Sequence, residues 1–247
     1  MKFFLMLSFK MIYKFFIAFL VLSSAVIYPQ YNGKSFAVGI NAIYTTTAKL
    51  YLYPNSSDVV LRNTSFPLSD IYNSGIYFRY RLSDDILIGV NAEYMTKTAS
   101  GKNLTVFSNN KTVTIQVQDG FKMIPFELSI YYLIPFSTER FKFLMGGGAA
   151  YYYGQQIRKF GNADINSSEA NIAYGIQVSV SMDFLLTGDV IIHSGMKFRD
   201  PQFTVKNTYN RQTADYNGTT IDLAQDSFVS KINVDGVSFE LGFAYSF

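Results

Sequence analysis

His193 and Ser194 are the residues whose types could support hydrolytic chemistry, because a histidine can take the proton of a serine nucleophile. His193 is the single histidine among 247 residues, and the chain has no cysteine. The two residues are adjacent, and adjacent side chains of a strand point to opposite faces, so they cannot form a catalytic pair. We therefore expect no enzymatic activity. We also expect no cofactor and no transition-metal site, which would need more histidine or cysteine ligands.

Charged side chains that could form ion pairs are the second notable group, and they are spaced through apolar segments. One subset is expected near mid-height of the folded protein: Glu93, Glu127, Glu240, Lys197 and Arg199. The other is expected nearer one end: Arg79, Arg81, Lys142, Asp183 and His193. Charges inside a protein are favourable only when they are paired and hydrogen-bonded. We therefore predict an ion-pair network that joins the three glutamates to Lys197 and Arg199.

These residues lie on eight segments with a period of two. Bulky apolar residues occupy every second position, and small or polar residues stand between them, which indicates strands. The segments are 34–44, 74–82, 86–97, 124–134, 140–154, 171–184, 190–199 and 236–247. Short links (83–85, 135–139, 186–189) alternate with long polar ones (45–70, 98–120, 154–170, 200–234). The alternation favours antiparallel up-and-down strands, which close into a barrel to remove their edges.

The size of the side chains decides which face is inside. Eight strands enclose a bore that side chains just fill, so small residues and a few charged ones suit it, and the bulky face must point outward into lipid. Segments of this length match a tilted crossing of a bilayer, with tyrosines near the segment ends. A soluble ligand-binding barrel would instead turn Phe126, Ile176 and Phe239 inward. We predict an all-β, eight-stranded antiparallel transmembrane barrel over residues 34–247, with parts of the long links extending the strands.

Composition excludes several other classes of protein. Hydrophobic residues make up 49% of the chain, aromatic residues 17% and charged residues 16%. Aromatic residues at this density exclude disorder. The net charge of +3 is too weak and scattered to indicate a nucleic-acid partner.

The first residues have the order of a secretory signal peptide. Lysines precede an apolar run at 15–22, and small residues follow at 23–25. We expect cleavage after Ala25, or as late as residue 30, and Met11 is an alternative start. An uncleaved membrane anchor is the alternative interpretation, although the apolar run is short for one.

The last segment ends in alternating apolar residues: Phe239, Leu241, Phe243, Tyr245 and Phe247. This pattern resembles the C-terminal signal by which outer-membrane barrels are recognised for assembly. With IPFELSIYYLI, FLMGGGAAYYYG and MKFRDPQF, it makes the chain resemble the eight-stranded outer-membrane β-barrel family of the OmpA, OmpX and OmpW type. The resemblance implies a bacterial outer-membrane location, a periplasmic N-terminus, long extracellular loops and the barrel assembly machinery as a partner.

Two functions remain open. The first is a structural or interaction role in the envelope, with a lumen closed by ion pairs and loops that bind an extracellular protein or ligand. The second is a small channel or conduit for a modest or apolar solute, which OmpW-like members suggest. Besides outer-membrane lipid, lipopolysaccharide is an expected partner, through rim cations: Lys49, Arg62, Lys102, Lys111, Arg158 and Lys159. Loop carboxylates such as Asp119 are expected to be solvated.

Overall fold

The computed structural model describes residues 34–108, 111–167, 171–223 and 226–247. The signal peptide expected at 1–25, its cleavage point and the alternative start at Met11 lie outside the described residues. The described chain is built mainly of strands, and its single helix is α2 (Val59–Asn63). No helix in this part of the chain is long and apolar enough to cross a bilayer.

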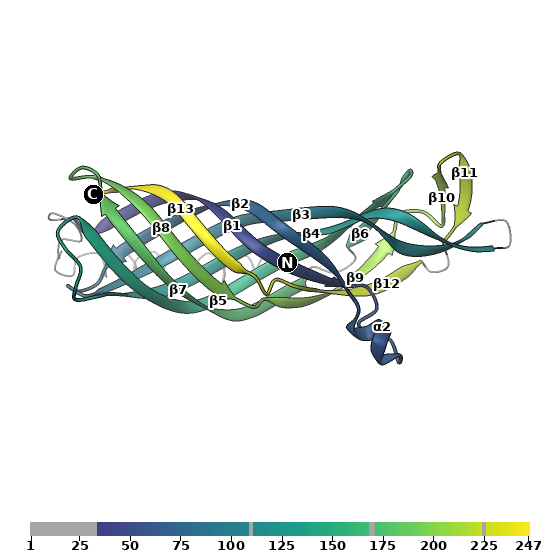
Figure 1. Ribbon diagram of the computed structural model, residues 1–247, viewed down its shortest axis with the longest axis horizontal. Coiled ribbons are helices and arrows are strands. Elements are labelled where there is room, and N and C mark those ends of the chain that lie inside the picture. Colours follow the sequence, from purple (N-terminus) through teal and green to yellow (C-terminus); the bar gives the residue numbers. More distant parts are fainter. Residues whose placement is uncertain (1–33, 109–110, 168–170, 224–225) are drawn as a thin grey trace, which may run out of the picture.

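Eight long antiparallel strands form a closed ring (Figure 1). In ring order they are β1 (Phe36–Tyr51), β2 (Ser65–Arg81), β3 (Ile86–Ser108), β4 (Lys111–Leu133), β5 (Phe141–Phe160), β7 (Asn171–Leu185), β8 (Val190–Arg199) and β13 (Val237–Ser246). The ring closes where β13 pairs with β1, from Ala37↔Ser246 to Thr45↔Ser238. The predicted eight-stranded antiparallel barrel is confirmed.

The short links between strands all lie at one end of the barrel, called here the turn end. The N–H of Phe36 donates to the carbonyl of Phe247 at 3.0 Å, and the N–H of Phe247 donates to the carbonyl of Phe36 at 2.9 Å. The first and last strands therefore meet at the turn end, where Figure 1 places the C-terminus.

The opposite end, called here the loop end, continues the barrel wall beyond the predicted segments. β3 and β4 each have 23 residues. Five shorter strands join them: β6 (Ala163–Ser167), β9 (Gln202–Tyr209), β10 (Thr213–Tyr216), β11 (Thr219–Asp222) and β12 (Ser227–Asn233). β9 pairs with β12 and β6, and β12 also pairs with β1. The long link at 200–234 thus contains a further hairpin, formed by β9 and β12.

The wall of the loop end is parted between β2 and β3. β2 and β3 pair from Arg81↔Leu87 up to Ser74↔Tyr94, and the described residues show no ladder pair between them beyond that point. Asp70 lies in the parted stretch of β2 with a φ of 55°, in the left-handed region. Lys97 of β3 reaches across the parting, and its Nζ donates to the carbonyl of Asp70 at 2.9 Å.

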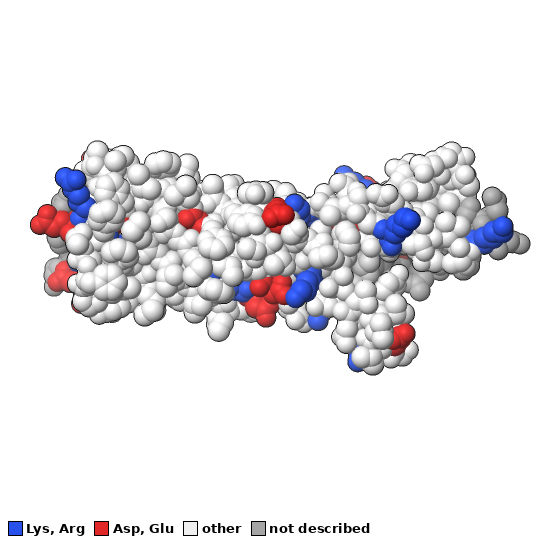
Figure 2. Space-filling view, in the orientation of Figure 1, with Lys and Arg blue, Asp and Glu red and all other residues white. Residues whose placement is uncertain are grey.

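The orientation of the strands agrees with the prediction. Phe126 is 51% exposed, Ile176 79% and Phe239 47%, so the bulky face points outward. The face in view in Figure 2 carries little charge between the rim of the turn end and mid-length. Glycines on the inner face leave room for larger neighbours: a Cβ on Gly146 would lie 2.4 Å from Cδ1 of Tyr131. Small residues point inward because the bore has no space for large ones on every strand.

Candidate functional site

Lys197 is the centre of a buried ion-pair network at mid-barrel. Its Nζ lies 2.8 Å from Oε1 of Glu93, 2.7 Å from Oε2 of Glu127 and 2.7 Å from Oε1 of Glu240. Three carboxylates from β3, β4 and β13 thus converge on one amine of β8. The side chains of these residues are 0–8% exposed, so the contacts are shielded from bulk solvent.

Arg199, the next inward-facing residue of β8, pairs with two of the same carboxylates. Its Nη2 lies 2.7 Å from Oε2 of Glu93, and its Nη1 lies 3.0 Å from Oε1 of Glu127. The side chain of Arg199 is fully buried. The structure therefore brings together all five side chains of the predicted mid-height subset.

Asparagine amides complete the network, and the sequence analysis missed them. The Nδ2 of Asn91 donates to Glu93 at 3.2 Å and to Glu127 at 3.1 Å. Asn73 donates to Oε2 of Glu93 at 3.0 Å, and Asn41 donates to Oε2 of Glu240 at 3.0 Å. Carboxylates have more acceptor sites than the two cations fill, and the amides supply further donors. A signal was present, because Asn41 and Asn91 share the inward phase of their strands with the predicted charges.

A second cluster lies nearer the turn end. Nη1 of Arg79 is 2.9 Å from Oδ2 of Asp183, and Nδ1 of His193 is 2.5 Å from Oδ1 of Asp183. The other ring nitrogen of His193 is 3.6 Å from Oε2 of Glu240. His193 therefore connects this cluster to the mid-barrel network.

The remaining two residues of the turn-end subset lie closer to the rim. Arg81 donates to the carbonyls of Ser83 and Asp84 in the β2–β3 turn, at 2.8 and 2.7 Å. Lys142 is half-buried and lies opposite Asp183 in the β5–β7 ladder. Arg81 thus binds the turn, where its Nη2 also lies 3.2 Å from Oδ1 of Asp84.

His193 and Ser194 lie on different faces of β8, as the strand period requires. His193 is buried and points inward. Ser194 pairs with Met182 and Leu241, two residues of the outward face. The described polar contacts of the imidazole are with the carboxylates of Asp183 and Glu240 and with the guanidinium of Arg79.

Buried side chains surround the network. A cavity of about 20 Å³ lies beside it, which is room for one water. Towards the loop end an apolar cluster lies next to the network, and its largest members are fully buried: Tyr152, Phe121, Leu50, Leu68, Met95 and Met123.

Asp119 and Arg158 form an ion pair inside the loop end. Nε of Arg158 lies 2.6 Å from Oδ1 of Asp119, and Nη2 lies 3.0 Å from Oδ2, which is a bidentate contact. Asp119 is fully buried and Arg158 is 4% exposed. The expectations that Arg158 meets lipopolysaccharide and that Asp119 is solvated are therefore wrong. The strands continue beyond the predicted segments and turn both side chains inward.

Tyr209 and Phe228 hold the guanidinium from its other sides. Nη1 of Arg158 donates to the hydroxyl of Tyr209 at 3.1 Å, and Cζ lies 4.7 Å from the centre of the Phe228 ring. Burial alone would lower the pKa of Arg158, but the Asp119 carboxylate outweighs it and the pKa is raised. Burial raises the pKa of Tyr209. Arg158 therefore stays charged and Tyr209 stays protonated.

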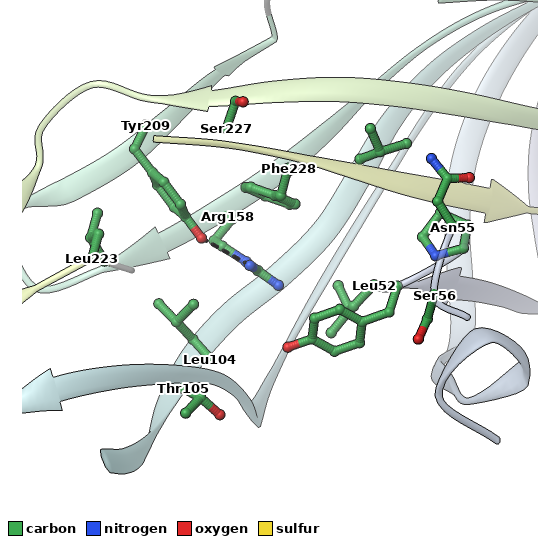
Figure 3. Close-up of a pocket in the computed structure, with 13 residues that line it drawn as sticks. Leu52, Asn55, Ser56, Leu104, Thr105, Arg158, Tyr209, Leu223, Ser227 and Phe228 are labelled. Carbon is green, nitrogen blue, oxygen red and sulfur yellow. Dashed lines mark hydrogen bonds between the residues drawn. The ribbon is translucent and has the colours of Figure 1, made fainter. Parts of the chain in front are cut away.

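A pocket of about 570 Å³ opens beside this ion pair at the loop end (Figure 3). Its apolar lining includes Leu52, Leu104, Leu223, Phe228 and Val229. Arg158 and Tyr209 supply polar groups to it. The sequence analysis did not predict this pocket, because its walls come from β3, β5, β9, β12 and the segment after β1.

Comparisons with known proteins support the fold. No protein-family model matches the sequence, and no curated protein sequence matches it. The solved structure of the outer membrane protein OprG from Pseudomonas aeruginosa matches with a TM-score of 0.60 and 15% identity, over 88% of this chain and 99% of that one. Two weaker matches are Ail of Yersinia pestis (TM-score 0.43, 9% identity, 87% and 99% covered) and Neisserial surface protein A (0.43, 14%, 86% and 97%). The match to OprG shows that the chain shares the fold of an outer-membrane β-barrel, as the sequence resemblance implied.

Proposed function

We propose that this protein is a bacterial outer-membrane barrel with a sealed lumen, and that its loop end binds a ligand or partner outside the cell. The network around Lys197 is the observation that carries the proposal. It fixes three carboxylates and two cations across the bore with contacts of 2.7–3.0 Å. An ion that entered would have to break these pairs and lose its own hydration shell.

The outward face supports placement in a bilayer. Apolar side chains point outward along every strand of the ring, and a bilayer core accepts only closed barrels and helices, in which each backbone group is paired. On β4, for example, Ile124, Phe126, Leu128, Ile130 and Tyr132 are all exposed. Their span of about nine residues is the length that a tilted strand needs to cross the hydrocarbon core.

We place the turn end in the periplasm and the loop end outside the cell. Cysteine labelling tests this orientation, because the chain has no cysteine of its own. Ser57→Cys adds an exposed thiol at the loop end, and Gly188→Cys adds one at the turn end, where a Cβ has open space. On intact cells an impermeant maleimide should label the first variant and spare the second. The reverse pattern would contradict the orientation.

Planar-bilayer recording tests the sealed lumen. The purified wild-type protein should give no steady conductance steps after reconstitution. Flotation of the same preparation with liposomes, together with a folded-band shift on unheated gels, establishes that a silent protein is inserted. Steady, ion-selective steps from the inserted wild type would overturn the sealed-lumen proposal.

Two expected partners, lipopolysaccharide and the barrel assembly machinery, would contact different parts of the surface. Lys102 and Lys159 are exposed at the loop end, where lipopolysaccharide phosphates would lie, whereas Lys49 is paired with Asp235 at 2.5 Å. In the last strand, β13, and at the residue after it, alternate side chains face outward, where the barrel assembly machinery would recognise them: Phe239, Leu241, Phe243, Tyr245 and Phe247.

The parting between β2 and β3 favours a second function, a conduit for apolar solutes with a lateral exit. Apolar side chains such as Leu68 and Met95 lie behind it, and the contact from Lys97 to Asp70 spans it. Entry of N-phenylnaphthylamine into intact cells tests this alternative. A conduit should accelerate the entry when the protein is expressed, and a sealed barrel should leave the rate unchanged.

A further inference from the structure

We propose that the pocket at the loop end binds a flat aromatic molecule that carries a neutral hydrogen-bond acceptor, such as a ketone or ester carbonyl. The inference deepens the proposed function, since it names the class of ligand that the loop end takes. It depends on the side chains around Arg158 and not on whether the lumen below conducts ions.

The size of the pocket fits a small molecule. Its volume of about 570 Å³ lies inside the range of about 300–1,000 Å³ that is usual for ligand sites. The walls are mostly apolar, from Leu52, Leu104, Leu223 and Val229. Polar side chains also line the pocket, among them Asn55, Thr105 and Ser227. Mostly apolar walls with a few polar groups are the usual composition of a small-molecule site.

Arg158 supplies the hydrogen-bond donors. Figure 3 shows its guanidinium reaching into the space that Leu104, Leu52 and Phe228 surround. A guanidinium carries five N–H bonds, and the described contacts use three of them, two to Asp119 and one to Tyr209. Two N–H bonds are therefore left to donate to a ligand.

The charge of the site favours a neutral acceptor over a carboxylate. Asp119 already neutralises Arg158 through a bidentate contact, so a second carboxylate would meet a site with no net positive charge. A carboxylate would also lose its hydration in an apolar pocket without a full counter-charge. A carbonyl oxygen can accept from the guanidinium at a much smaller desolvation cost.

The aromatic groups at the site favour a flat ligand. Phe228 covers one side of the guanidinium, and its ring centre is 5.2 Å from that of Tyr209. Planar π systems stack on guanidinium faces and pair with neighbouring rings in offset or edge-on arrangements. An aromatic ligand can pair with these rings while its acceptor faces the free N–H bonds, which lie in the plane of the guanidinium.

The polar side of the pocket is held in place before a ligand arrives. Asp119, which positions Arg158, also accepts hydrogen bonds from Asn103 at 3.1 Å and from Gln156 at 3.5 Å. Gln156 in turn accepts from Asn207 at 2.8 Å. Side chains fixed in this way lose little conformational entropy on binding, which favours affinity.

Fluorine NMR on the protein in lipid nanodiscs tests the proposal with three matched probes. They are 4-fluoroacetophenone, which has a neutral carbonyl; 4-fluorobenzoate, which is charged; and 1-ethyl-4-fluorobenzene, which has no acceptor. Empty nanodiscs report partition into lipid alone. We expect saturable binding of the ketone, and binding weaker by about twofold to tenfold for the probe without an acceptor, the effect of one net hydrogen bond.

A substitution that fills the pocket, compared with a matched control substitution elsewhere, identifies the binding site. Ser227 is exposed and lines the pocket, so Ser227→Trp should abolish saturable binding of the ketone. Ser69 is an exposed serine of β2 outside the lining, and Ser69→Trp should bind as the wild type does. Intermolecular NOEs from the ketone methyl to the methyls of Leu104 and Leu223 locate the probe in the wild type without any substitution.

Three results would overturn the proposal. They are equal binding of the ketone by Ser227→Trp and wild type, binding of the benzoate as tight as that of the ketone, or no saturable binding by folded wild-type protein. None of them bears on ion flow through the lumen, which the bilayer recordings measure separately.

Discussion

Replacing Lys197 by methionine should destabilise the barrel strongly, because it removes the shared cation of three carboxylates. Methionine keeps the length of the chain and its apolar stem, so the lost group is the amine. Glu93 and Glu127 would keep Arg199 as a partner. Glu240 would keep only Asn41 at 3.0 Å and His193 at 3.6 Å among its described contacts.

The size of the effect follows from the contact distances. A pair of unit charges at 2.7 Å attracts with about 6 kcal/mol at an effective dielectric constant of ~20. Desolvation of the buried amine, several kcal/mol, opposes this attraction. Since two of the three carboxylates keep a cation, we expect a net loss of about 3–5 kcal/mol, as is usual when one partner of a buried pair is removed.

Urea unfolding of the protein in lipid vesicles measures the loss. Far-UV circular dichroism and the folded-band shift on unheated gels follow the transition, and tyrosine fluorescence gives a third probe, because the chain has no tryptophan. Lys159→Met is the control, since Lys159 is exposed at the loop end. It should change the free energy of unfolding by less than about 0.5 kcal/mol.

The double variant Lys197→Met, Glu240→Gln separates charge from packing. It removes the carboxylate that the single variant leaves without a cation, so it should recover roughly half of the loss. A single variant as stable as the wild type would refute the reasoning, since it would mean that the network contributes no net stability. A double variant less stable than the single one would show that packing, and not charge, sets the cost.

Two further predictions concern the wall of the barrel and its assembly. Gly148→Ala should lower the free energy of unfolding by about 1–3 kcal/mol or prevent folding, because the new Cβ would lie 1.9 Å from the carbonyl oxygen of Leu128. Gly147→Ala, whose Cβ would meet its nearest atom at 3.3 Å, should be tolerated in the same urea titration. Phe247→Ala should reduce the amount of protein assembled in the outer membrane of cells while folding into detergent stays near wild type. Normal surface levels of that variant would contradict the assembly-signal interpretation.

The sequence was sufficient to predict the segments of the barrel whose bulky residues face outward. On β4, for example, the alternation of Phe126, Leu128 and Ile130 with small or polar residues fixes both the strand and its orientation. The bore of eight strands then dictates which face is inside. Ion pairing in the lumen follows, because a charge at the middle of a narrow bore must find a partner.

The strands of the loop end could not be predicted in the same way. Its strands carry a weaker pattern, since their outward residues are polar and only the inward ones are apolar. In hindsight Asp119 stands between inward-facing Val117 and Phe121, and Arg158 stands next to inward-facing Phe160 at the same spacing. That phase could have predicted their burial. The pairing of β12 with β1 joins residues about 180 positions apart, and no local pattern specifies it.

The closure of the ring between β1 and β13 has a consequence for how the chain can be rearranged. The backbone bonds between Phe36 and Phe247 make this junction equivalent to any other in the wall. A circular permutant that joins these neighbours by a short linker and opens the chain near Ser57, in the exposed link after β1, retains every ladder pair of the ring. The order in which the ribosome makes the strands is therefore separable from the position that each strand takes in the cylinder.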